Sequence, residues 1–227
     1  MEISVSTVHR LTEDVTECVR DCFPIARSVV EAAINVGYIA AGGLKVAEEA
    51  RQHSVRRSVL DLNRCLDIGI MSFRQRARSL DQPDSVPGLR QALRQIEEKR
   101  DSKPRNWTSL SAPKRIEAIL DRFGVQIAGH LGNAYFFVYQ DASEVVHGTV
   151  YGCFLSLGQT LVDQELALHD KVFTILLACS IALNRSVASI GLAHDFQEIV
   201  ETADTFDMLL MDIPAFAEAF SRYTLER

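Results

Sequence analysis

The chain is poor in the residues that interrupt helices. Six prolines and twelve glycines are few among 227 residues, and the alternation of apolar and polar residues that is typical of strands is rare. Alanine, leucine, arginine, glutamate and glutamine are abundant instead, and all five favour helices. Nearly half of the residues are hydrophobic, which is enough to form a packed core. The sequence therefore predicts an all-α fold of eight or nine helices with no significant sheet.

The common motifs of nucleotide, zinc and ester chemistry are also missing. The chain holds no GxxxxGK[ST], GxGxxG, HExxH or GxSxG segment and no CxxC pair. This argues against the readily identified NTPases, dinucleotide enzymes, zinc proteases and α/β-hydrolases. Cys18 and Cys22 lie one helical turn apart, but no second pair of ligands has the spacing of a metal site. We therefore expect neither a metal nor a cofactor.

A signal-peptide pattern and a long hydrophobic run are absent as well. The first 22 residues are rich in charge, and the five cysteines are odd in number, which is typical of reduced cytosolic thiols. The most apolar run, Val172 to Leu183, is only ~12 residues long and too short to cross a bilayer. It predicts a buried core helix. We expect a cytoplasmic protein without a membrane segment.

The helix signals predict one domain over residues 1–227. Pro24 is expected to begin a helix that ends at Gly42-Gly43, because proline suits a first turn and glycine a helix end. From Leu44 to about Leu80 only Gly69 interrupts the pattern, which predicts one long helix or two collinear helices. Residues 79–111 include the proline-containing loop DQPDSVPG, so this stretch is expected to be a flexible or partner-facing insertion.

Later helices are predicted from the same signals. Ser111 and Pro113 open one helix and Gly124 ends it. The other predicted helices cover Thr7–Arg20, 88–100, Glu165–Leu192, Asp195–Met211 and a last segment from Pro214. A further helix is predicted from Asn133, and it either ends at His147-Gly148 or continues through Tyr151 to Leu157.

Charge is distributed unevenly along the chain. The net charge is −6, but residues 51–122 carry 16 basic and 9 acidic side chains, a net charge of +7. A basic middle segment attracts polyanions such as RNA. Alternatively, it packs against the acidic remainder, within one chain or across a homodimer. The sequence leaves both interpretations open.

A stripe of polar side chains runs through the segment Asn133–Thr149. Tyr135, Tyr139, Ser143 and His147 follow one another at spacings of four, which places them on one slowly winding face of a helix. A histidine accepts and donates protons near pH 7. The stripe is therefore either part of a catalytic site or a set of half-buried tyrosines with a hydrogen-bonded histidine at a helix end.

A second pair supplies the charge that the stripe lacks. Arg27 and Glu31 lie four residues apart in a segment that is otherwise almost uncharged. In a catalytic interpretation His147 is the acid or base, Arg27 holds a phosphate, and Glu31, Tyr139 and Ser143 orient the groups. Metal-free RNA cleavage needs little more, because the 2′-OH of RNA is itself the nucleophile.

Three segments carry a resemblance to a known group of proteins. RSVVEAAINVGYIA (Arg27–Ala40), NWTSL (Asn106–Leu110) and YQDASEVVHGT (Tyr139–Thr149) occur in this order. Together they resemble an uncharacterised prokaryotic family of helical proteins akin to the HEPN superfamily and to abortive-infection proteins. The resemblance implies a HEPN-like helical bundle, frequent dimers, and a role in phage defence or toxin–antitoxin systems. Active HEPN proteins are metal-free endoribonucleases.

The chain departs from the active HEPN pattern at one place. That pattern sets an arginine five to seven positions before the histidine, where this chain has Gln140, Asp141 and Ala142. Only His147 matches the motif, so Arg27 is expected to supply the missing charge from another helix.

Two main functions follow from the sequence. The first is an RNA-cleaving effector of a defence or toxin module, with RNA attracted by residues 51–122. The second is a non-catalytic helical subunit that binds a protein partner from the same operon. A nucleotide sensor that binds phosphate without cleaving is a third.

Overall fold

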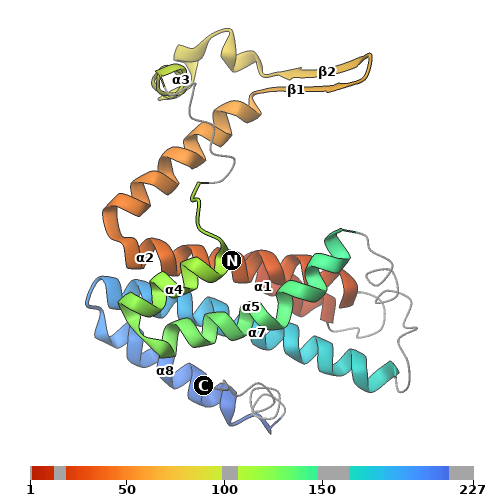
Figure 1. Cartoon of the computed structure of the whole chain (residues 1–227), viewed down its shortest axis with the longest axis vertical. Helices are drawn as coiled ribbons and strands as arrows, with labels where there is room; N and C mark the ends of the chain where they lie inside the picture. Colours follow the sequence, from red (N-terminus) through yellow and green to blue (C-terminus); the bar gives the residue numbers. More distant parts are fainter. Residues whose placement is uncertain (1, 13–18, 99–106, 148–163, 215–227) are drawn as a thin grey trace. The chain divides into compact units, whose positions relative to one another are not determined.

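The structure is a computed structural model that describes residues 2–12, 19–98, 107–147 and 164–214 (Figure 1). Contacts divide the chain into two compact units. Unit 1 comprises residues 1–43 and 110–227, and unit 2 comprises residues 44–109. The partner-facing insertion predicted over 79–111 thus falls almost wholly within unit 2, which begins 35 residues earlier than the predicted insertion.

Unit 1 is a bundle of helices. Its elements are α1 (Glu2–Thr12), the first part of α2 (Val19–Asp61), α4 (Ala112–Phe123), α5 (Val125–Val146), α7 (Gln164–Ala193) and α8 (Gln197–Met211). Helix α5 packs along α7 and against α4, and α7 also contacts α8 and α1. Helices α5 and α7 therefore form the centre of the bundle (Figure 1).

The core of unit 1 is built from apolar side chains that recur every three or four residues. Ile34, Ile119, Leu131 and Ile175, from α2, α4, α5 and α7, are completely buried in one cluster. At Gly37 on α2 a Cβ atom would lie 2.9 Å from Ile119 Cδ1. Glycine therefore allows α2 to approach α4 closely enough for their side chains to meet.

The boundary between the units lies inside α2. Gly43 has φ 64° and ψ −154°, which interrupts the helical backbone. Glycine adopts a positive φ without the steric cost that other residues incur. The helix end predicted at Gly42-Gly43 is therefore confirmed. The predicted start at Pro24 is wrong, because the helix already includes Val19 and Pro24 lies within it.

Unit 2 contains the remainder of α2 and a small set of short elements. They are β1 (Asn63–Ile68), β2 (Met71–Arg76), the 3-10 turns η1 (Arg78–Leu80) and η2 (Pro83–Ser85), and α3 (Leu89–Glu98). Val59, Leu89 and Ala92 form a small separate core. This unit therefore buries few apolar side chains of its own.

The predicted helix from Leu44 to Leu80 is wrong beyond Asp61. Residues 63–76 form an antiparallel hairpin, in which Leu66 pairs with Phe73 and Ile68 with Met71. Gly69 has φ 57° and occupies the first position of the two-residue turn, where a positive φ is required. Apolar residues at alternate positions and this glycine favour a hairpin over a helix.

Over the residues that the structure describes, the protein is all-α apart from this hairpin. The described residues contain seven α-helices and one two-stranded sheet. A total of eight or nine helices stays a prediction for the whole chain. Helix α5 begins at Val125, earlier than predicted, because Gly124 with φ 84° separates it from α4. Helices α7 and α8 lie close to their predicted bounds.

Several predictions fall on residues outside the described ranges. They are the second half of the first predicted helix, Cys18, and the helix predicted from Pro214 onward. No group of three or more potential metal ligands occurs among the residues that the structure describes.

Two helices are long and apolar enough to cross a membrane by length and composition alone. They are Arg20–Asp61 in α2 and Lys171–Ala193 in α7. Within the α7 window 61% is buried inside the protein, as in the core helix of a bundle. The burial of Ile175, Ala178 and Ile181 shows that α7 uses its apolar residues for packing.

Candidate functional site

Polar side chains from α2, α4 and α5 gather in unit 1, and we call them the Arg27 cluster. Its members are Arg27, Glu31, Asn35, Arg115, Tyr135 and Tyr139. The α2 members follow one another at spacings of four, and so do the two tyrosines of α5. Each helix therefore presents one stripe of polar groups to the other.

Arg27 is the centre of the cluster. Its Nε lies 3.1 Å from Glu31 Oε1, and its Nη2 donates to the hydroxyl of Tyr139 at 3.4 Å. The guanidinium carbon lies 4.4 Å from the centroid of the Tyr139 ring, within the range of a cation–π contact. The side chains of Arg27 and Glu31 remain 22% and 39% exposed. A ligand can therefore reach both.

The two tyrosines form a stacked pair beside Arg27. The rings of Tyr135 and Tyr139 lie 4.4 Å apart at 29°. Burial, followed by the neighbouring Tyr139 and Glu31, raises the pKa of Tyr135 to about 12. The hydroxyl of Tyr135 therefore stays protonated at neutral pH and serves as a hydrogen-bond donor rather than a base.

Arg115 adds a second positive charge from α4. Its Nη1 donates to Asn35 Oδ1, and its Nε donates to the carbonyl of Ser111 at 3.5 Å. Burial lowers the pKa of Arg115, and the charges of Glu31 and Tyr135 offset only part of this effect. An arginine remains charged under such shifts. The cluster thus contains two guanidinium groups near one carboxylate.

The structure brings together three of the five predicted site residues. Arg27, Glu31 and Tyr139 meet, whereas Ser143 and His147 lie one and two turns further along α5. His147 is eight residues beyond Tyr139, about 12 Å along a helix, and it caps the C-terminal end of α5. Its side chain is exposed, and the described residues offer it no hydrogen bond or ion pair.

Sequence reasoning did not find Arg115 as a site residue. It lies in a helix with several other charged side chains, so nothing local distinguishes it. The hydrogen bond to Asn35, 80 residues earlier in the chain, reveals its role. Asn35 continues the stripe of Arg27 and Glu31, and this was the only available signal.

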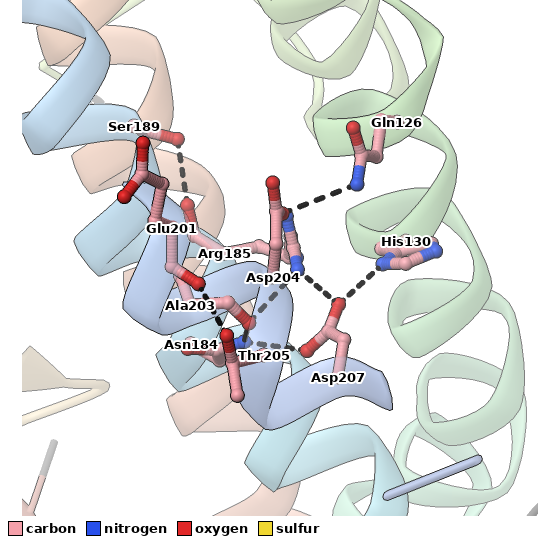
Figure 2. Close-up of polar contacts among 10 residues, drawn as sticks. All are labelled: Gln126, His130, Asn184, Arg185, Ser189, Glu201, Ala203, Asp204, Thr205 and Asp207. Carbon is pink, nitrogen blue, oxygen red and sulfur yellow. Dashed lines mark hydrogen bonds and ion pairs between the residues drawn. The ribbon is translucent and has the colours of Figure 1, made fainter. Parts of the chain in front are cut away.

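A second polar group lies between α5, α7 and α8, and we call it the Arg185 network (Figure 2). Arg185 is completely buried; its Nη1 lies 2.9 Å from Asp204 Oδ1, and its Nη2 pairs with Asp207 Oδ2. His130 Nδ1 lies 2.9 Å from the same Asp207 oxygen. The further members are Asn184, which donates to Asp207, and Gln126, which donates to Asp204 at 3.1 Å.

The carboxylate of Asp207 in the Arg185 network is stabilised by its partners within the fold. Burial alone raises the pKa of Asp207, but the hydrogen bond from His130 and the charge of Arg185 outweigh it and bring the pKa below its usual range. Arg185 Nε is buried without a hydrogen-bond partner in the described residues. A buried arginine that makes two ion pairs joins α7 to α8, and no ligand reaches it.

Sequence reasoning assigned no role to His130 or to Arg185. The apolar run of α7 ends at Asn184 and Arg185, and Asp204 and Asp207 lie one turn apart on α8. These spacings do not show that the two segments face each other. Because Arg185 is inaccessible and Arg27 is not, the Arg27 cluster is the candidate functional site.

The observed geometry defines an all-α protein with a partly exposed Arg–Glu–Tyr cluster on its bundle. Residues 5–164 match DUF5677, a family of unknown function, and the chain belongs to this family. The match includes every member of the Arg27 cluster and ends where α7 begins. No curated protein matches the chain, and no solved structure does.

Proposed function

We propose that the protein is an effector of a prokaryotic defence or toxin module that cleaves RNA without a metal, and that the Arg27 cluster is its catalytic site. The observation that supports this is the meeting of Arg27, Glu31 and Tyr139. These residues supply a cation, a carboxylate and a hydroxyl from two helices. RNA cleavage by attack of the 2′-OH on the adjacent phosphodiester requires these three groups.

In the proposed reaction Glu31 accepts the proton of the 2′-OH, and O2′ attacks the adjacent phosphorus. The bond from phosphorus to O5′ breaks, and Tyr139 donates its hydroxyl proton to O5′. The proton held by Glu31 then returns to Tyr139 through water. The products are a 2′,3′-cyclic phosphate and a 5′-hydroxyl. Arg27 and Arg115 stabilise the negative charge on the phosphorane in the transition state.

The wider setting of the site agrees with this role. Unit 2 carries 14 basic and 9 acidic side chains, a net charge of +5, whereas unit 1 has a net charge of −11. A basic unit attracts RNA to the protein. We further propose that the helices of unit 1 form a HEPN-like bundle, and that the protein is cytoplasmic, homodimeric and encoded with a protein partner in one operon.

The direct test is RNA cleavage by the full chain in the presence of EDTA. The wild type is expected to release fragments with 2′,3′-cyclic phosphate ends. Glu31→Gln and Tyr139→Phe remove the proton acceptor and donor with little change in shape, and each is expected to reduce cleavage by roughly 10²–10⁴-fold. Cleavage undiminished in both variants would exclude this mechanism.

His147→Ala and Ser143→Ala are the matched controls, since both residues lie on α5 outside the cluster. They are expected to retain most of the activity. Loss of activity in His147→Ala alone would instead support the histidine-centred site that the sequence predicts. Circular dichroism of each variant establishes that the helices remain folded.

A second candidate function rests on a different observation. Both arginines of the cluster already have partners within the chain, since Arg27 contacts Glu31 and Tyr139 while Arg115 contacts Asn35. This arrangement favours a structural network in a non-catalytic subunit that binds a partner protein. It predicts no cleavage by the wild type, and a loss of stability for Arg27→Ala that exceeds the loss for an exposed arginine such as Arg51.

A further inference from the structure

The two arginines of the Arg27 cluster have partners of different kinds. Arg27 Nε forms an ion pair with Glu31 Oε1 at 3.1 Å. Arg115 instead donates to two uncharged oxygens, which are Asn35 Oδ1 and the backbone carbonyl of Ser111. Within the described part of the chain, Arg115 forms no ion pair with a carboxylate. The charge of Arg27 is therefore balanced by a direct partner, whereas the charge of Arg115 is not.

Burial makes the unbalanced charge of Arg115 important. The residue is half-buried, and the loss of hydration lowers its pKa. Glu31 is near enough to oppose this change, but its charge and that of Tyr135 offset only part of it. A cation that has lost part of its hydration is unfavourable without a counter-ion. An anionic ligand that reaches Arg115 supplies this missing charge.

Asn35 fixes the direction of the Arg115 side chain. It lies one turn after Glu31 on α2, and the close approach of α2 to α4 at Gly37 and Ile119 brings its carboxamide to Arg115 Nη1. Because the carboxamide is uncharged, the hydrogen bond orients the guanidinium group and leaves its positive charge intact. An arginine has five N–H groups, and the described contacts of Arg115 use two of them. The others can donate to a ligand.

The charges of the cluster indicate which anion fits it. Arg27, Arg115 and Glu31 supply two positive charges and one negative charge, a net charge of +1. An internal phosphodiester of RNA carries a single negative charge and balances it. A terminal phosphomonoester carries about −1.5 to −2 at pH 7, and Glu31 repels the second charge. The cluster therefore matches a phosphodiester better than a free nucleotide.

We propose that Arg115 binds the scissile phosphodiester of RNA before the reaction, and that Asn35 is the positioning residue that holds Arg115 in place. This inference rests on the proposed function, because that function supplies the phosphodiester. Arg27 acts at a different stage. When Glu31 accepts the proton of the 2′-OH it becomes neutral, so Arg27 loses its counter-charge as the phosphorane gains a second negative charge. Arg115 thus acts from substrate binding onward, whereas Arg27 becomes available in the transition state.

The first experiment measures binding without cleavage. The probe is a dinucleoside monophosphate with a 2′-O-methyl group, which holds one phosphodiester and lacks the nucleophilic hydroxyl. Titration of the isotope-labelled full chain, followed by nuclear magnetic resonance, is expected to shift the Nε–H signal of Arg115. Arg115→Ala is expected to raise the Kd about tenfold or more, because it removes hydrogen bonds from a charged donor. Lys114→Ala removes the same charge from an exposed neighbour that is paired with Glu117, and is expected to leave the Kd within about twofold.

The second experiment tests the role of Asn35. Asn35→Leu removes the acceptor with a side chain of similar shape, and is expected to raise the Kd about threefold or more because Arg115 is no longer pre-organised. Asn35→Asp retains an acceptor but neutralises Arg115, and is expected to weaken binding by at least as much. In the Arg115→Ala background, Asn35→Leu is expected to have no further effect on the Kd. Urea unfolding of each variant establishes that the bundle remains folded.

Several results would overturn the proposal. They are a wild type whose Arg115 signal does not shift, equal Kd values for Arg115→Ala and Lys114→Ala, wild-type binding by Asn35→Asp, and an effect of Asn35→Leu that is the same with and without Arg115. Tighter binding of uridine 5′-monophosphate than of the dinucleotide would also overturn it, because the site would then belong to a free nucleotide.

These binding measurements are separate from the cleavage assay. Binding as expected, together with no RNA cleavage by the wild type in EDTA, would retain the phosphate site and reject the proposed function. Cleavage that depends on Glu31 and Tyr139, together with wild-type binding by Arg115→Ala, would retain the proposed function and reject the phosphate site.

Discussion

The guanidinium carbon of Arg27 on α2 lies 4.4 Å from the ring centroid of Tyr139 on α5, although 112 residues separate the two in the chain. The same guanidinium group is paired with Glu31. The ring and the hydroxyl of Tyr139 therefore both contact the guanidinium group of Arg27, while Glu31 pairs with Nε of Arg27. This contact joins α2 to α5 at a surface that ligands can reach.

A double-mutant cycle measures this contact directly. Arg27→Ala, Tyr139→Leu and the double variant are expected to give a coupling energy of about 0.5–1 kcal/mol, because a partly exposed cation–π contact is worth that much. The measurement is urea unfolding followed by circular dichroism. A coupling energy of zero would show that the two side chains do not interact in solution.

Truncation of Arg185 is expected to be far more damaging than truncation of Arg27. Arg185→Ala removes the partner of Asp204 and Asp207 and leaves Asp207 buried without its cation, at a cost of about 3–5 kcal/mol in the free energy of unfolding. The additional change Asp207→Ala is expected to recover part of this loss, since it removes the unpaired charge. Equal stability of Arg185→Ala and wild type in urea unfolding would contradict the observed network.

Asp207 predicts a specific dependence of stability on acid. Its pKa is lower in the folded protein than in the unfolded chain, so the unfolded state binds the proton first as the pH falls. The contribution of Asp207 is fully present above its unfolded pKa of about 3.9 and is lost as the pH falls through the folded value. Unfolding measured from pH 6 to pH 2 is expected to show a shallower loss of stability in Asp207→Asn, over the acid range only.

Tyr135 predicts the opposite dependence at high pH. Its pKa is raised to about 12 in the folded protein, compared with about 10 in an unfolded chain. Its contribution to stability is present below pH ~10 and is lost as the pH rises through the folded value. Ultraviolet titration of phenolate absorbance is expected to show a late-ionising tyrosine that Tyr135→Phe removes. Ionisation of every tyrosine near pH 10 would indicate that Tyr135 is solvated.

The sequence allowed the helical class and many element bounds to be predicted, because these depend on local signals. Gly43 ends the first part of α2, and the apolar run beginning at Val172 forms a buried core helix, as expected. The Arg27–Glu31 pair was also predictable, since a spacing of four places two side chains together on any helix. Each of these features is determined by residues that lie close together in the sequence.

The hairpin shows where local reasoning fails. Residues 63–76 lack proline and contain arginines and leucine, so they satisfied a helical pattern. Gly69 was treated as an interruption of a helix, whereas it forms the turn of the hairpin with a positive φ. A short amphipathic segment fits both the period of a helix and the period of a strand. Pairing with a neighbouring strand then decides which of the two structures forms.

The amino-acid sequence by itself determined that this protein is built from amphipathic helices with an uneven charge, because periodicity and composition act over neighbouring residues. The tertiary structure alone decided which polar groups meet. It placed Tyr139 near Arg27 and Arg115 near Glu31, set His147 apart at the end of α5, and joined Arg185 to Asp204 and Asp207. These contacts connect residues far apart in the chain, and their formation depends on how whole helices pack around a shared apolar core.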